Sequence, residues 1–296
     1  TTEIYTLSLH DALPIYNAEL SADMRSLGVY EPGKNYNVLA FGKYGTGFAP
    51  PTLEEWAELK KLRAVSAPAI RAIGTNQKID LSKTKYFPPI GNQGSEGSCT
   101  CFSTGYYIHT YTMAKEFNWD LSGTTWSSTW PGAPQSDKQK YIISPDFIYH
   151  QINSGVDNGS SAVSAFGLLS RMGAATWNTM PYSDQDHTSW PSEDAFMEAA
   201  LYRGSEVFKL NGYLHYGYFI IRDDSDINLL KQLLLNGFLV STSVDATNEN
   251  SVYAFFTAQD VSVMSSVPSG YSIDHAQTIV GFKDGSAWDI NNPGDC

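Results

Sequence analysis

The sequence predicts an α+β protein whose two lobes meet at a cleft. Helical periodicity dominates from about residue 98 to 235, whereas β-rich runs separated by Gly, Asn, Asp and Ser clusters dominate from about 236 to 296. The 296 residues are 42% hydrophobic and 13% aromatic, which is enough apolar material for a large core. No internal repeat is visible.

The first 78 residues are expected to lie outside the main domain. Residues 1–15 resemble the translation of a sequencing adapter, as found in assembled metagenomic genes, so we expect a non-native segment; an ordinary extension strand is the alternative. They lack the basic start, apolar run and small-residue cleavage site of a secretory signal. Residues 16–78 read as an N-terminal extension of loops and extended segments with one helix.

That helix is predicted from the start signal in residues 50–55. Thr52 and Glu55 make a capping box directly after Pro50 and Pro51, and apolar residues follow along one face. We expect an accessory helix that packs on the main domain. The alternative is the remnant of a propeptide that blocks a cleft.

The main domain is expected over residues 79–296. Pro and Gly residues exclude regular structure from about 86 to 97, and a helix then runs from Cys99 to about Glu116. A Trp-rich stretch at 118–140 reads as a surface loop. The further predicted elements are helices over Ser161–Arg171 and Asp223–Leu235 and strands over Phe238–Val244, Tyr253–Phe256 and Ala276–Phe282.

Charge and composition exclude several classes of function. The chain has 19 basic and 31 acidic residues and a net charge of -12, which repels nucleic acids and anionic lipid. No apolar run approaches the roughly 20 residues of a membrane-spanning helix. The three cysteines do not form a disulfide framework. We therefore expect no nucleic acid partner and no membrane span, and the oligomeric state stays open.

Cys99 is the candidate nucleophile, because it occupies the first turn of a predicted helix. The positive end of the helix dipole stabilises a thiolate over a thiol. Glycines before it, Gly97 among them, allow close approach of a substrate. Gln93 in the same loop is placed to direct its amide N–H at an oxyanion, together with the Cys99 backbone N–H.

A thiolate nucleophile needs an imidazole partner, and His275 is the candidate. Ile273-Asp274-His275-Ala276 immediately precedes a predicted strand, and a histidine at a strand mouth is well placed to face a helix N-terminus. From the residues alone, a structural role for His275 remains the alternative. Structural roles are expected for the other five histidines, His10, His109, His150, His187 and His215.

Two separate motifs carry a resemblance to a known family. Gln93-Gly94-Ser95-Glu96-Gly97-Ser98-Cys99 resembles the Gln-Gly-x-x-Gly-Ser-Cys signature of papain-like cysteine peptidases, and Asp274-His275-Ala276 is similar to the motif around that family's catalytic histidine. The resemblance covers about residues 79–294 and points to a prokaryotic, often exported branch. It implies a papain-like two-lobed fold with a helical lobe, about 98–235, and a β-barrel-like lobe, about 236–296, whose C-terminal strands are truncated.

The resemblance also implies roles for residues outside the two motifs. Asn291 falls where the family has the asparagine that orients its histidine, although Pro293 replaces the usual tryptophan. Gly159 matches a glycine that pairs with substrate backbone. The residues expected to bind substrate are Gly159, Asn158, Gly97 and Asp274.

Departures from the family pattern occur close to Cys99. Glu96 and Val156 occupy the positions of a usual cysteine pair, so both halves of one expected disulfide are absent together. Thr100 and Cys101 replace the usual Trp and Ala. We expect Cys101 to be a small buried residue rather than a second nucleophile.

The resemblance implies an endopeptidase that transfers an acyl group to Cys99. His275 would move the proton, Asn291 would orient His275, and Gln93 would stabilise the oxyanion. Substrates would be peptides or proteins, with no metal or organic cofactor, and the location extracellular or at the cell surface. The alternatives are a papain-fold binding or scaffold protein without activity, and an amidase or transglutaminase with a similar Cys-His pair.

Overall fold

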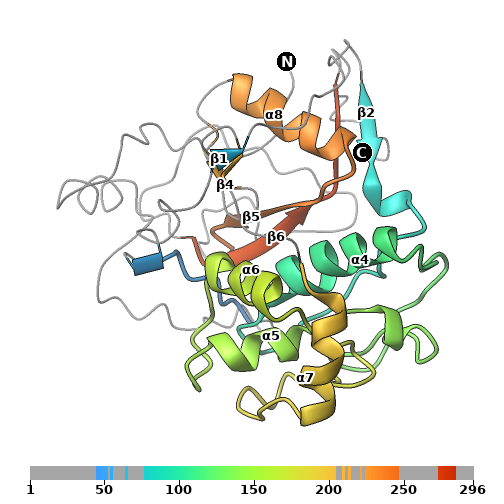
Figure 1. Cartoon of the computed structure of the whole chain (residues 1–296), viewed down its shortest axis with the longest axis vertical. Helices are drawn as coiled ribbons and strands as arrows, with labels where there is room; N and C mark the ends of the chain where they lie inside the picture. The colour runs from blue at the N-terminus through green and yellow to red at the C-terminus, as the bar shows by residue number, and fades with distance from the viewer. Residues whose placement is uncertain are drawn as a thin grey trace.

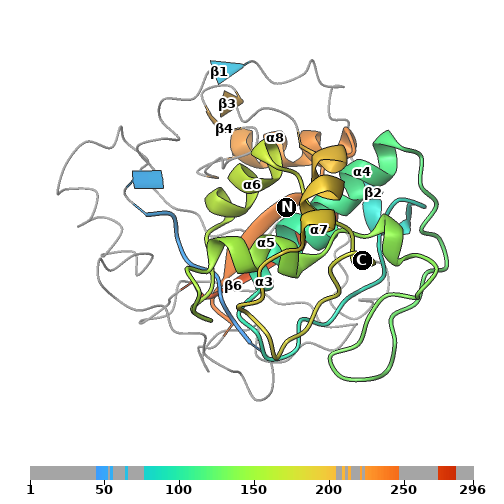
Figure 2. The same cartoon turned by 60° about the horizontal axis from the view of Figure 1, so that its bottom comes forward.

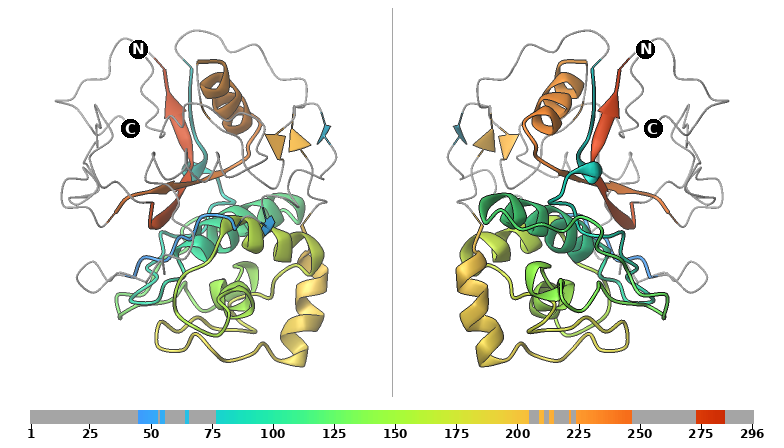
Figure 3. Two further views of the ribbon diagram at one scale, coloured as in Figure 1. Left: turned by 90° about the vertical axis from the view of Figure 1, so that its left-hand side faces the viewer. Right: turned by 90° about the vertical axis from the view of Figure 1, so that its right-hand side faces the viewer.

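The computed structural model describes residues 45–52, 54–55, 64–65, 77–204, 209–210, 213–214, 221, 224–246 and 273–284. Within these ranges the chain forms two lobes (Figure 1). One lobe consists of helices, and the other combines short strands with helix α8 (Asp224–Leu235), as both views in Figure 3 show. The predicted α+β class is confirmed.

A long helix begins at Cys99 and forms the centre of the helical lobe. It consists of α3 (Cys99–Cys101), the π-helical stretch η2 (Phe102–His109) and α4 (Thr110–Glu116). The predicted helix is thus confirmed in position, but its middle has the wider π-type hydrogen bonding, in which the Thr110 N–H donates to the Gly105 carbonyl. Gly105 allows close helix contact, because a Cβ there would lie 2.2 Å from the Cδ1 atom of Ile148.

Three further helices surround this central helix (Figure 2). They are α5 (Pro145–Ile152), α6 (Ala162–Arg171) and α7 (Glu193–Ala199), and the short 3-10 turns are η1 (Leu81–Lys83), η3 (Gln139–Tyr141) and η4 (Ala200–Tyr202). A serine caps the N-terminus of each α-helix by accepting a backbone N–H: Ser144, Ser161 and Ser192. Of these three helices, only α6 was predicted from the sequence.

The loop over residues 118–140 contributes to the core as well as the surface. Trp126 packs edge to face on Tyr106 and Trp177, with ring centroids 5.8 and 5.5 Å apart. Trp177 and Tyr106 are fully buried. The expectation of a plain surface loop was therefore incomplete, because its Trp126 packs on Tyr106 in the middle of the central helix.

Short strands build the second lobe. Strands β5 (Val240–Val244) and β6 (His275–Ile279) pair antiparallel, with Val244 opposite His275. The predicted strand over Ala276–Phe282 is divided at Val280 into β6 and β7 (Gly281–Lys283). The other strands are β2 (Lys78–Asp80), which pairs with β7, and β1 (Ala64–Val65), β3 (Lys209–Leu210) and β4 (Tyr213–Leu214), which form a separate sheet.

The described strands form small separate sheets rather than a closed barrel. The predicted strand over Tyr253–Phe256 lies outside the described residues. Helix α8 packs on β5 and β7, and its Lys231 makes a buried ion pair of 2.6 Å with Asp284. The domain boundaries inferred from the sequence stay a prediction.

The capping box at the start of the predicted accessory helix is confirmed. The Thr52 N–H donates to Glu55 Oε2 over 2.7 Å, and the Glu55 N–H donates to Thr52 Oγ1 over 3.1 Å. Most of that helix lies outside the described residues. The Glu55 carboxylate also accepts the hydroxyls of Ser161 and Ser164, which anchors this segment at the N-terminus of α6.

Candidate active site

Cys99 lies at the first turn of α3 and is buried, with 1% of its surface exposed. The Ala276 backbone N–H donates to its Sγ atom over 3.4 Å. Burial raises the pKa of the thiol to about 11, although the N–H groups of Ala276 and Gly47 oppose this rise. In this conformation burial therefore outweighs the stabilisation of the thiolate by these N–H groups, and the thiol is neutral at neutral pH.

His275 is the first residue of β6 and directly precedes the residue that contacts the thiol. Burial lowers the pKa of its imidazole to about 4, so the ring is neutral as well. Its Nδ1 atom is buried and has no hydrogen-bond partner among the described residues. One ring nitrogen has to face the thiol, which leaves the other for an orienting carbonyl.

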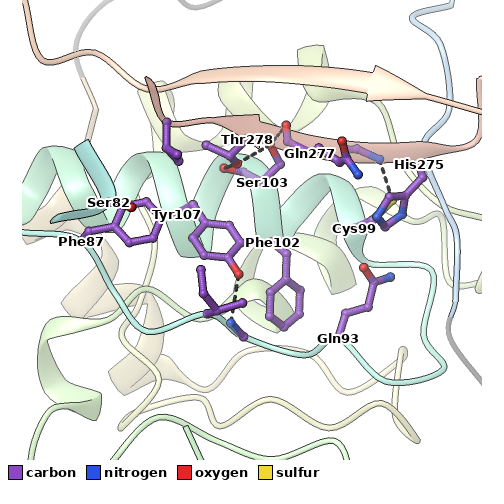
Figure 4. A pocket seen from close by; sticks show the side chains of 14 residues that line it. Ser82, Phe87, Gln93, Cys99, Phe102, Ser103, Tyr107, His275, Gln277 and Thr278 are labelled. Atoms are coloured by element: carbon purple, nitrogen blue, oxygen red, sulfur yellow. Dashed lines mark hydrogen bonds between the residues drawn. The ribbon is translucent and has the colours of Figure 1, made fainter. Parts of the chain in front are cut away.

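Cys99, His275 and Gln93 lie at one end of a cavity of about 370 Å³ (Figure 4). Ser82, Phe87 and Tyr107 line its opposite end. The Gln93 amide comes from the loop before α3, His275 from the second lobe and Cys99 from the helical lobe. The structure thus brings together three of the four residues predicted to be catalytic.

Ser103 joins the two lobes one helical turn beyond Cys99. Its hydroxyl donates to the Gln277 carbonyl over 2.8 Å and shares hydrogen bonds with the hydroxyls of Ser241 and Thr278 at 2.8 and 3.0 Å. These bonds hold β5 and β6 against the central helix, so they position His275 relative to Cys99. The sequence analysis missed Ser103; its place four residues after Cys99, on the same helix face, was the available signal.

Residues 45–50, which we call the covering segment, run in extended form past the thiol. The Phe48 N–H donates to the Asp274 carbonyl over 2.8 Å, and the Ala49 N–H donates to the Ser160 carbonyl over 3.0 Å. The Ser160 N–H donates back to the Gly47 carbonyl over 2.8 Å. In Figure 3 this blue segment lies at the junction of the two lobes.

Glycines make this close passage possible. A Cβ on Gly47 would lie 1.9 Å from the Gly97 carbonyl oxygen, and one on Gly159 would lie 2.1 Å from the Gly47 carbonyl oxygen. The Gln93 amide is also engaged, because its Nε2 donates to the carbonyls of Gly45 and Glu96 over 3.0 and 2.9 Å. The covering segment therefore contacts both the Cys99 thiol and the Gln93 amide.

The residues predicted to bind substrate have different surroundings. Gly97, Gly159 and the Asp274 carbonyl all contact the covering segment. The Asp274 side chain instead accepts the Ala246 N–H. Asn158 is exposed in a turn, and its backbone N–H donates to the Val156 carbonyl. Asn291 lies outside the described residues.

Near Cys99, a hydrogen bond rather than a disulfide connects the preceding loop to the turn at 153–159. Cys99 and Cys101 are both free and buried. Glu96 is buried, whereas Val156 is exposed. Asp157, the next residue, accepts the Gly97 N–H over 2.9 Å and so links the loop before Cys99 to the turn at 153–159.

No helix in the described part of the chain has both the length and the apolar character needed to cross a membrane. No protein-family model and no curated protein matches the sequence. The similarity to known proteins therefore rests on the comparison with solved structures.

Two solved structures resemble the chain over most of its length. Xylellain, a cysteine protease from Xylella fastidiosa, matches with a TM-score of 0.52 and 17% identity over 82% of this chain and 82% of that one. The digestive procathepsin L2 proteinase from the larval midgut of Tenebrio molitor matches with a TM-score of 0.52 and 16% identity, over 91% of this chain and 75% of that one. The chain thus has the two-lobed fold of the papain-like cysteine proteases.

Proposed function

We propose that this protein is a cysteine endopeptidase held in a covered state by its own residues 45–50. The observation that carries the proposal is the pairing of an extended peptide with Ser160 and Asp274 directly over Cys99. A site that binds its own backbone in this way is suited to bind a substrate peptide in the same place. The fold, which it shares with cysteine proteases, supports this assignment.

In the proposed reaction, the Cys99 sulfur attacks the carbonyl carbon of a peptide bond after His275 has accepted the thiol proton. The Gln93 amide and the Cys99 backbone N–H stabilise the oxyanion. His275 then donates the proton to the leaving amine, and water hydrolyses the thioester with His275 as base. Asn291 is proposed to supply the carbonyl that orients the His275 imidazole. The covering segment must leave first.

The test compares two buried cysteines that lie two residues apart. With the covering segment displaced, as in a Gly47→Ala background, Cys99→Ala should abolish hydrolysis of a broad peptide library and labelling by a thiol-directed epoxide, whereas Cys101→Ala should retain both. Cys101 is the matched control, because it is equally buried but packs in the hydrophobic core, with the Ser160 hydroxyl 3.8 Å from its Sγ. Equal turnover by the Cys99→Ala variant and its parent would sink the proposal.

A binding protein without activity is the second candidate, and the burial of Cys99 favours it. Its signature would be an unlabelled Cys99 even after the covering segment has been displaced. An amidase or transglutaminase would instead transfer the acyl group to added amines. Export of the protein, which the resemblance implies, is part of our proposal and predicts recovery from the culture fluid rather than the cell lysate.

A further inference from the structure

Three buried side chains converge behind the loop that precedes Cys99. They are Glu96 on the loop and Asp146 and His150 on α5, and one ligand atom of each lies within 4.8 Å of the other two. The His150 Nε2 atom is 3.6 Å from Asp146 Oδ1 and 3.9 Å from Glu96 Oε1. All three residues are at least 95% buried.

The atoms that face the centre of this group have no hydrogen-bond partner among the described residues. His150 Nδ1 is 2.6 Å from the Ser189 carbonyl, so this nitrogen carries the proton and the Nε2 lone pair points into the group. Asp146 accepts the Ser183 N–H with Oδ2, which leaves Oδ1 for the group. The His150 and Asp146 side chains are thus each oriented by a hydrogen bond made on the side away from the group.

Glu96 is the least satisfied of the three. Neither of its carboxylate oxygens has a hydrogen-bond partner in the described part of the chain. The hydroxyls of Ser98 and Tyr182 are nearby, but Tyr182 donates to the Gln93 carbonyl and shares a 2.8 Å hydrogen bond with Ser98. The protons of both hydroxyls are therefore used elsewhere, and a buried carboxylate without a partner is costly.

We propose that Glu96, Asp146 and His150 form a structural binding site for a divalent transition-metal ion of the Zn²⁺ class. Two carboxylate oxygens and one imidazole nitrogen are a common donor set for such an ion, whereas Ca²⁺ and Mg²⁺ prefer oxygen ligands alone. Ligand atoms around a tetrahedral Zn²⁺ are about 3.4 Å apart, given bonds of about 2.1 Å. The His150 nitrogen lies 3.6 and 3.9 Å from the two carboxylate oxygens, so these distances exceed the spacing by up to about half an ångström, and the Glu96 and Asp146 oxygens lie within 4.8 Å of each other.

The charge around the group also favours a cation. The Asp184 and Asp186 carboxylates add negative charge near Asp146, and Asp157 does so near Glu96. Burying several acidic groups together without a compensating positive charge is unfavourable. A divalent ion would neutralise the two ligand carboxylates.

The ion would brace the loop that carries Gln93. The Glu96 carbonyl accepts the Gln93 amide over 2.9 Å, so fixing Glu96 to α5 also fixes Gln93. The metal link would thereby join the loop to the helical lobe at a position where the sequence lacks a disulfide. This inference is independent of peptidase activity, because it concerns binding and stability.

Metal binding is best measured in the Cys99→Ala variant, which removes the thiol of the candidate active site as a competing ligand. After treatment with a chelator, this protein should bind one equivalent of Zn²⁺ by calorimetry, and its melting temperature should rise on binding. Glu96→Gln and His150→Gln in the same background should weaken binding by about 100-fold or more. Asp137→Asn is the control, since it removes an exposed carboxylate that is not part of the group and should bind Zn²⁺ as tightly.

Co²⁺ provides a second readout that does not depend on the folding of the variants. In the Cys99→Ala protein, bound Co²⁺ should give the strong visible bands of a tetrahedral site without a thiolate charge-transfer band. The inference is overturned if this protein binds no Zn²⁺ and no Co²⁺, if binding is equally tight in Glu96→Gln, or if a thiolate band appears. A proton shared within the group would then explain its arrangement.

Discussion

At the scale of single residues, burial decides the state of the two groups proposed to be catalytic. It raises the pKa of Cys99 to about 11 and lowers that of His275 to about 4. Both shifts favour the neutral form, so between these values the pair holds a thiol and a neutral imidazole. The covered state is therefore unreactive for electrostatic as well as steric reasons.

The alkylation rate of Cys99 in the full-length protein should depend steeply on pH. Because the thiolate is the reactive form and the pKa is raised to about 11, the rate should keep rising as the pH increases from 7 to 10. The measurement is iodoacetamide labelling quantified by mass spectrometry, with Cys99→Ala reporting the background. A rate that already reaches its plateau at pH 8 would show that the thiol pKa is not raised.

Local motifs were sufficient to predict that Cys99, His275 and Gln93 lie together, but not how these residues are held in place. Cys99 and His275 were identifiable because each lies in a short motif at the start of an element. Ser103 was missed because its partners Gln277 and Thr278 are more than 170 residues away in the sequence. Glu96 was recognised only as a replaced cysteine, since nothing local shows that His150 faces it.

At the scale of elements, the covering segment connects the N-terminal extension to the candidate site. The sequence predicted loops and extended chain before residue 50, and this is what the described residues form. Its docking was not predictable, because Gly45-Thr46-Gly47 has the composition of an ordinary loop. The element proposed from sequence to block a cleft was the helix that follows, whereas residues 45–50 contact Cys99.

Gly47→Ala should displace the covering segment. The added Cβ would lie 1.9 Å from the Gly97 carbonyl oxygen, which leaves no room for docking. We expect Cys99 labelling and peptide hydrolysis at neutral pH to increase by roughly tenfold or more, which corresponds to docking weakened by about 1.4 kcal/mol.

Gly167→Ala is the control for this change, because a Cβ there meets nothing closer than 3.6 Å. It should leave both rates unchanged. If Gly47→Ala also leaves Cys99 labelling unchanged, the covering segment does not restrict access to the thiol.

Helix starts show how far local chemistry can predict elements. Helices α5 and α7 were not predicted, although Ser144-Pro145-Asp146 and Ser192-Glu193-Asp194 both contain a capping serine followed by acidic residues in the first turn. Both helices are short, so their apolar residues show no clear helical period. The π-helical stretch η2 has no comparable local signal and depends on packing against neighbouring helices.

At the scale of the whole molecule, the second lobe depends on a buried ion pair. Lys231 on α8 and Asp284 after β7 are 2.6 Å apart, with side chains only 6% and 10% exposed. The Asp284 N–H also donates to the Gln77 carbonyl over 2.7 Å, which extends the connection to the chain before β2. Sequence patterning could not reveal this link, because Lys231 interrupts a leucine-rich helix face without a visible partner.

Asp284→Asn should destabilise the protein by about 3–5 kcal/mol, because it leaves the Lys231 charge buried without its carboxylate. Urea unfolding followed by circular dichroism would measure the loss. Asp137→Asn, at an exposed position, should change stability by less than about 0.5 kcal/mol. If the two variants are equally stable, the ion pair makes no net contribution to the fold.

The covering segment also serves as a template for a selective chemical probe. Its Gly47 N–H acts on the Cys99 sulfur, so an electrophilic carbon built at this position of a short peptide would start next to the nucleophile. The segment also sets the rest of the scaffold: no side chain at the Gly47 position, which lies against Gly97, and then an aromatic ring as in Phe48. The covering segment thus defines the chemical features that an inhibitor of this site needs.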